Sequence, residues 1–173
     1  MPYLAIYLND HLAGATGGVE LARRASASNR GHKTFGQPLD RVCEEIEEDR
    51  ATLQEVIDLF GFSESHVKTA AAWVAEKLGR LKLNGRLRGY SPLSRVLELE
   101  GLLIGITGKM ALWETLAEVG GFERLEVDFE RMSARAAEQR SVVDDLHRLA
   151  TAALTTDGHP PEIRPRPARA PRP

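Results

Sequence analysis

The sequence has a single cysteine, few aromatic residues and no long apolar run. Cys43 alone cannot form an internal disulfide or a cysteine-based zinc site, and its place among apolar residues predicts a buried structural thiol. No stretch reaches the roughly 18 uninterrupted apolar residues of a membrane-spanning helix. The first residues also lack the basic flank of a signal peptide. We therefore expect a soluble, cytoplasmic protein that does not enter a membrane.

An excess of charge of one sign is also lacking. The formal net charge is −2, from 23 basic and 25 acidic residues, so no overall attraction to nucleic acid or anionic membranes is expected. A length of 173 residues with 42% hydrophobic residues suits one globular domain. Residues 157–173 contain six prolines and four arginines, a composition that cannot bury enough apolar surface to fold. We predict a helical domain over 1–156 and a disordered tail over 157–173.

Apolar residues recur at helical spacing throughout the first 156 residues, and no segment alternates in the manner of a strand. This pattern predicts an all-α fold. Ser91-Pro92 is a strong helix-start signal, a capping residue followed by proline at the first helical position, and Gly61 suits a helix end. The expected helices cover about 2–29, 38–60, 63–78, 92–119 and 127–155.

The helix expected from Ser63 would cross the length of the bundle, so that the second and fourth helices run parallel. The result is a four-helix bundle with a crossover helix. In the fourth helix the expected apolar stripe leaves Trp113 projecting away from it. The residues of this stripe are Leu93, Val96, Leu97, Leu103, Ile104 and Ala111.

Ionisable residues interrupt the apolar stripes of three helices. Arg50 falls between Ile46 and Leu53, and Glu100 aligns with Leu93. Arg140 and His147 share one line of the last helix. These positions predict a polar seam inside the bundle, with Asp49 and Asp144 beside it.

In its helices and its inward polar residues, the chain resembles bacterial members of the ferritin-like superfamily over about residues 2–155. The di-iron members of that family take one Glu from each of two helices and a Glu-x-x-His from each of the other two. In this chain Arg50 stands at the expected histidine after Glu47, and Asp144 with His147 is the nearest match in the last helix. Glu100 matches a single-carboxylate ligand. The resemblance thus implies a ferritin-like bundle with degenerate di-iron motifs.

Two interpretations of the seam follow. In the first, Arg50 and Arg140 converge on Glu100 in a buried ion-pair network. Such a protein needs no cofactor, is non-enzymatic and acts through protein association, of which a homodimer is one form. The network would comprise Arg50, Glu100, Arg140, Asp49, Asp144 and His147.

In the second interpretation the seam binds iron or manganese through an irregular ligand set, in an oxidoreductase or iron-binding protein. The ligands would be Glu100, Asp144, His147 and His11. A third possibility is contact with nucleic acid through the basic residues of 77–95. We expect these basic residues to pair instead with the acidic start of the second helix, within or between chains.

A glycine cluster interrupts the first helix at Gly14, Gly17 and Gly18. Each glycine costs about 1 kcal/mol relative to alanine inside a helix. The cluster predicts that another helix, or a ligand, approaches the backbone closely.

Overall fold

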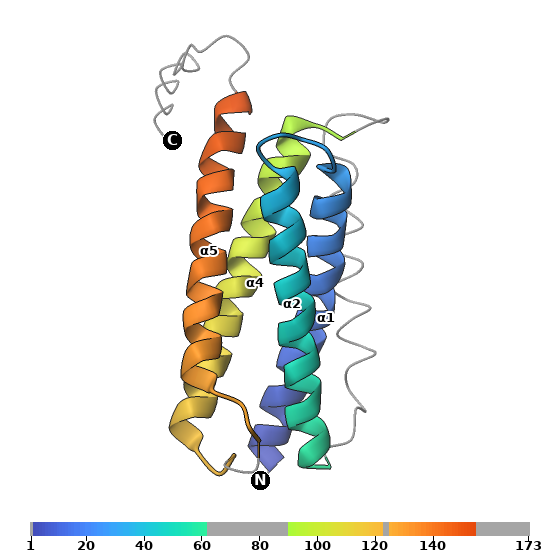
Figure 1. Ribbon diagram of the computed structural model, residues 1–173. Helices are drawn as coiled ribbons and strands as arrows, with labels where there is room; N and C mark the ends of the chain where they lie inside the picture. Colours follow the sequence, from blue (N-terminus) through green and yellow to red (C-terminus); the bar gives the residue numbers. More distant parts are fainter. Residues whose placement is uncertain (1, 62–89, 123–124, 155–173) are drawn as a thin grey trace, which may run out of the picture.

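The computed structural model describes residues 2–61, 90–122 and 125–154 (Figure 1). Within these ranges the chain is helical and contains no strand, which confirms the all-α class. The helix expected from Ser63 and the tail expected over 157–173 lie outside the described residues. The elements are α1 (Pro2–Ser28), α2 (Gly36–Leu59), α4 (Pro92–Val119), α5 (Phe129–Thr151) and the short 3₁₀-helix η2 (Ala152–Leu154).

Local sequence signals set most of the helix ends. The Ser91 hydroxyl accepts a hydrogen bond from the backbone N–H of Ser94 at 3.1 Å, with proline at the first helical position. Gly61 follows α2 with a φ of +61°, and Gly120 follows α4 with a φ of +65°. Glycine adopts this left-handed conformation without steric cost, which is why it ends helices so often.

The four helices pack as a bundle in which α2 and α4 run parallel (Figure 1). At one end, the guanidinium of Arg95 in α4 lies over the ring of Phe35, just before α2, at 4.4 Å. At the other end, the rings of Phe60 and Phe122 meet at 5.3 Å. Helix α2 therefore ends, and α4 begins, at opposite ends of the bundle. Helix α1 runs antiparallel to both, and α5 lies along α4 (Figure 1).

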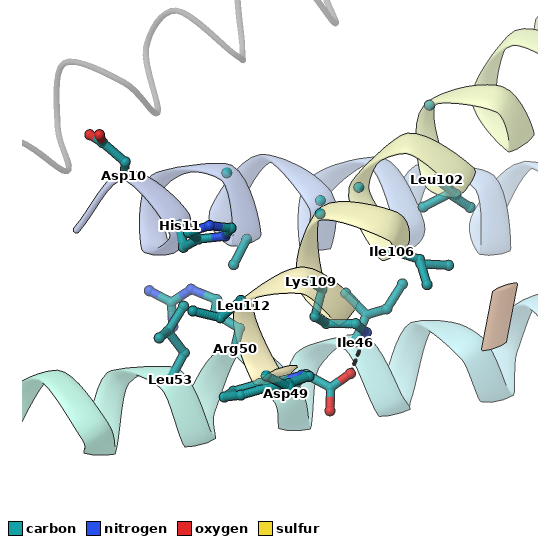
Figure 2. Close-up of a pocket in the computed structure, with 17 residues that line it drawn as sticks. Asp10, His11, Ile46, Asp49, Arg50, Leu53, Leu102, Ile106, Lys109 and Leu112 are labelled. Atoms are coloured by element: carbon teal, nitrogen blue, oxygen red, sulfur yellow. Dashed lines mark hydrogen bonds and ion pairs between the residues drawn. The ribbon is translucent and has the colours of Figure 1, made fainter. Parts of the chain in front are cut away.

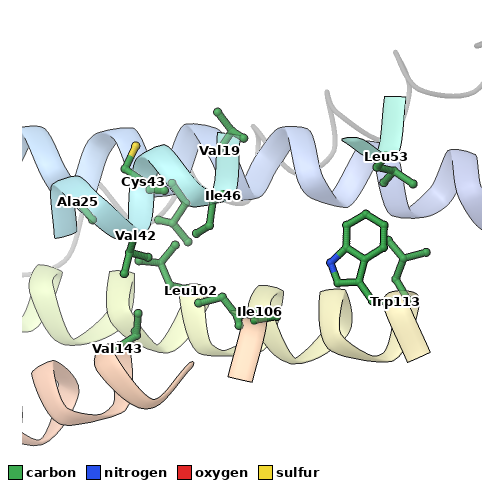
Figure 3. Close-up of a cluster of buried hydrophobic side chains, with 14 of the residues drawn as sticks. Val19, Ala25, Val42, Cys43, Ile46, Leu53, Leu102, Ile106, Trp113 and Val143 are labelled. Atoms are coloured by element: carbon green, nitrogen blue, oxygen red, sulfur yellow. The ribbon is translucent and has the colours of Figure 1, made fainter. Parts of the chain in front are cut away.

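A continuous apolar core joins the helices, and Figure 3 shows its central part. Cys43 is 8% exposed and belongs to this core, so its predicted burial is confirmed. Burial at about 25 cal/mol per Å² of apolar surface is the main stabilising contribution in such a bundle. The fully buried residues of this core include Leu8, Leu12, Leu39, Leu53, Val56, Ile57, Leu99, Ala136 and Val143.

The face that α4 turns to the core differs from the predicted stripe. Ile104 is 76% exposed and Leu93 is 39% exposed, whereas Trp113 is fully buried. Because α4 is apolar on most sides, helical periodicity alone does not determine which side faces inward. Although α4 is apolar on most sides, neither it nor any other described helix is long and apolar enough to cross a membrane. The core positions of α4 are Val96, Leu99, Leu102, Ile106, Leu112, Trp113 and Leu116.

Candidate functional site at Asp49

The buried charge at the middle of the bundle is Asp49, in α2, which is 2% exposed. Side chains from two other helices surround its carboxylate. The ammonium of Lys109 in α4 forms an ion pair with Oδ2, and the guanidinium of Arg135 in α5 forms one with Oδ1. The amide Nε2 of Gln139 also donates to Oδ2, at 3.2 Å. Both carboxylate oxygens are thus engaged, and three helices are joined through one residue.

These four residues, called here the Asp49 cluster, are linked to one another as well. Lys109 donates a second hydrogen bond to the side-chain oxygen of Gln139, which is 1% exposed. Arg135 reaches the surface and pairs with Glu48 at 2.9 Å. Burial lowers the pKa of Lys109 below its ordinary value, although the Asp49 carboxylate opposes this shift. The neighbouring carboxylate favours the protonated form of Lys109.

A second polar cluster holds one end of the bundle and is centred on Glu98 of α4, which is 4% exposed. Its Oε1 lies 2.7 Å from the Arg24 Nε of α1, and its Oε2 accepts from the Tyr90 hydroxyl at 2.9 Å. Asn29 donates to Tyr90 at 2.9 Å and accepts from Arg95 at 2.7 Å. Burial raises the pKa of Glu98 against the opposing effects of Tyr90 and Arg24. This cluster fixes the end of α1 to the start of α4.

A cavity of about 310 Å³ lies next to the Asp49 cluster, between α1, α2 and α4 (Figure 2). Its walls are mainly apolar, and its charged lining includes Asp49, Lys109 and Arg50. The Arg50 side chain is half-buried, and its Nε donates to the Thr16 hydroxyl at 3.3 Å. His11 lines the same cavity, and burial lowers its pKa despite the neighbouring Asp10.

The structure brings some of the predicted seam residues together and separates others. Asp49 is buried, and Arg50 is half-buried beside the same cavity. Glu100 is on the surface with 48% of its side chain exposed, where it contacts His147 at 3.3 Å. Arg140 is exposed as well. Asp144 pairs with Arg148, at 3.3 Å.

The expected convergence of Arg50 and Arg140 on Glu100 is therefore replaced by a different arrangement. Helix α4 is rotated relative to its predicted stripe, whereas Ala136, Val143 and Ala150 of α5 are buried. Glu98 is buried where Glu100 was expected, and Gln139 is buried where Arg140 was expected. A shift of one or two residues along a helix moves a side chain by 100° to 200° around its axis.

The four residues considered as metal ligands do not meet at one place. Glu100 and His147 are in contact, Asp144 faces Arg148, and His11 lies at the cavity on α1. In the part of the chain that the structure describes, no three His, Cys, Asp or Glu residues are grouped so that they could hold a metal ion.

Lys109, Arg135, Gln139 and Glu98 were not identified from the sequence. One signal does point to Lys109, because it is the only charged residue between Glu100 and Glu114. A lone charge in a long apolar segment is usually paired when it is buried. No family model, curated protein or solved structure matches this chain.

Proposed function

We propose that the protein is a non-enzymatic, cytoplasmic bundle of ferritin-like ancestry that acts through protein association. In this proposal the Asp49 cluster stands at the bundle centre in place of a metal site. The observation that supports it is the neutralisation of the central carboxylate by Lys109 and Arg135.

The chemistry of a metal site differs from that of this cluster. Carboxylates that bind iron or manganese offer their oxygens to the metal ion. Both oxygens of Asp49 instead face cationic groups, which repel a metal cation. Two acidic and two basic side chains meet here, Asp49 and Glu48 with Lys109 and Arg135, so their formal charges sum to zero. The cluster needs no further positive charge.

Protein association is supported by exposed apolar side chains at one end of the bundle, where α1 begins and α2 and α4 end. We call this group the end patch. Exposed fractions reach 86% for Tyr3, 54% for Ile6, 53% for Leu59 and 52% for Val119. Interaction sites are commonly built from exposed apolar side chains. The form of association proposed is a homodimer through the end patch.

The association can be tested by measuring molecular mass across a range of concentrations, with sedimentation equilibrium or light scattering. Dimerisation should weaken when Leu59 is replaced by Gln. The control is Ile104→Gln, which removes a side chain that is 76% exposed near the middle of α4, outside the end patch. A wild-type protein that stays monomeric throughout, or equal weakening by both variants, would contradict the proposal.

The alternative is an iron or manganese protein with an irregular ligand set. It is favoured by the contact between Glu100 and His147, since a carboxylate and an imidazole are both ligands of these metals. Elemental analysis of the purified protein separates the two proposals.

A further inference from the structure

Glycines from two facing helices line the cavity beside the Asp49 cluster. Gly14 and Gly18 come from α1, and Gly105 and Gly108 from α4. Glycine inside a helix is destabilising relative to alanine, and close approach of two backbones commonly offsets this cost. Here, apart from the glycine, its chain neighbours and the adjacent backbone of its own helix, no atom of the described residues lies within 4 Å of a Cβ built at any of these four positions. The missing side chains leave space open.

Gly101 shows the contrast. A Cβ at this position would lie 2.8 Å from the Leu21 side chain, so here the glycine does permit close packing between α4 and α1. The other four glycines keep the cavity wide instead. A volume of about 310 Å³ corresponds to roughly ten water molecules at about 30 Å³ each. It lies at the lower end of the range of small-molecule sites.

The polar groups around the cavity are mainly hydrogen-bond donors. Lys109 has three N–H donors and uses two of them on Asp49 and Gln139. Arg50 uses its Nε, and its terminal nitrogens have no acceptor among the described residues. Trp113 is fully buried, and its Nε1 likewise has no acceptor there. Figure 3 shows this nitrogen on the edge of the ring nearer to Ile106.

Acceptors are few by comparison. Both oxygens of Asp49 are already engaged. Asp10 is exposed at the rim, and Figure 2 shows its carboxylate turned away from the other lining residues. A ligand that suits this cavity therefore brings hydrogen-bond acceptors and an apolar body.

We propose that the cavity binds a small organic carboxylate. Its carboxylate pairs with the planar fork of Arg50, which matches two carboxylate oxygens at once. Its hydrocarbon part lies against the apolar wall of Leu53, Leu102, Ile106 and Leu112. The Asp49 cluster holds Lys109 at the edge of the same space. This binding site goes beyond the proposed association and does not depend on it.

The test uses the full chain carrying Trp73→Phe, which leaves Trp113 as its single tryptophan. Benzoate and the straight-chain carboxylates from butanoate to decanoate are titrated while Trp113 fluorescence is followed, with calorimetry as a second readout. At least one carboxylate should saturate the protein with a Kd of about 1 mM or below. The alcohol and the amine of the same chain length should bind at least about tenfold more weakly, because neither supplies an anionic pair of acceptors.

Substitutions distinguish the site from nonspecific binding. Arg50→Met should weaken carboxylate binding at least about tenfold. The affinity of Arg50→Lys should lie between those of the parent and Arg50→Met, since lysine keeps the positive charge but lacks the planar fork of arginine. Arg41→Met is the control, because Arg41 lies on the same helix with 68% of its side chain exposed. Gly105→Leu should abolish binding without lowering the melting temperature, since its side chain enters open space and leucine favours a helix.

Three results would overturn the proposal. The first is that no carboxylate saturates the folded protein, and the second is that Arg50→Met binds as the parent does. The third is that Gly105→Leu lowers the melting temperature by several degrees, which would mean that another part of this chain already fills the cavity. Circular dichroism of every variant confirms that the helices are retained.

Discussion

Replacing Asp49 by Asn removes the central charge of the Asp49 cluster while preserving the shape of the side chain. Lys109 then keeps only neutral oxygen partners, although just 14% of its side chain is exposed. Arg135 is affected less, because it still pairs with Glu48 at the surface. The main cost of the substitution is therefore an ammonium group left buried without a counter-charge.

The magnitude follows from this geometry. Removing one partner of a buried ion pair costs about 3–5 kcal/mol, and the remaining contacts of Arg135 place Asp49→Asn near the lower value. With a urea dependence of about 2 kcal/mol per molar, the unfolding midpoint should fall by about 1.5 M. Helicity followed by circular dichroism during urea unfolding measures this shift.

The control is Glu20→Gln in α1, which breaks the exposed pair of Glu20 with Arg23. Its expected cost is below about 0.5 kcal/mol. Adding Lys109→Met to Asp49→Asn should recover at least half of the lost stability, because no unpaired ammonium remains. Equal midpoints for Asp49→Asn and Glu20→Gln would refute this reasoning.

Three further predictions follow from local features. The folded protein holds a proton on Glu98 to higher pH than the unfolded chain does, because burial raises the pKa of this carboxyl. The stability of the wild type should therefore fall relative to that of Glu98→Gln as pH rises from about 4. A difference in urea midpoint between the two proteins that does not change with pH would contradict this. Burial raises the Cys43 pKa to about 11. At about pH 8 its thiolate fraction, and hence its rate of modification by a thiol reagent, should be roughly 100-fold lower than in the unfolded chain. Similar modification rates with and without denaturant would be inconsistent with this. Gly105→Ala should raise the free energy of unfolding by up to about 1 kcal/mol. Gly101→Ala should raise it by less, since its methyl group would lie 2.8 Å from the Leu21 side chain. The melting temperatures of the two variants show which one is more stable.

Local signals in the sequence predict the helices well. Ser91-Pro92, Gly61 and Gly120 each act through their own backbone geometry, and the observed helices end within a few residues of the expected positions. The inward face of α2 is also predicted, because its Ile46 and Leu53 stand out against many charged neighbours. These features depend on short stretches of chain.

The rotation of α4 could not be predicted in the same way. Its apolar residues surround the axis, so only packing against α1 and α5 determines that Glu98 is buried and Glu100 exposed. The Asp49 cluster depends on this rotation, since Lys109 reaches Asp49 only from the face that α4 adopts. Gln139 is neutral, so a search for charged residues passes over it.

The central claim is that cationic side chains, and not a metal ion, neutralise the carboxylate at the centre of this bundle. Elemental analysis tests it most directly. The protein would be expressed with iron, manganese and zinc supplied, and purified without an affinity tag or a chelator. We expect far less than one transition-metal ion per chain. A near-stoichiometric amount of iron or manganese that disappears when Asp49 is replaced by Asn, in a variant that circular dichroism shows to be folded, would contradict the claim.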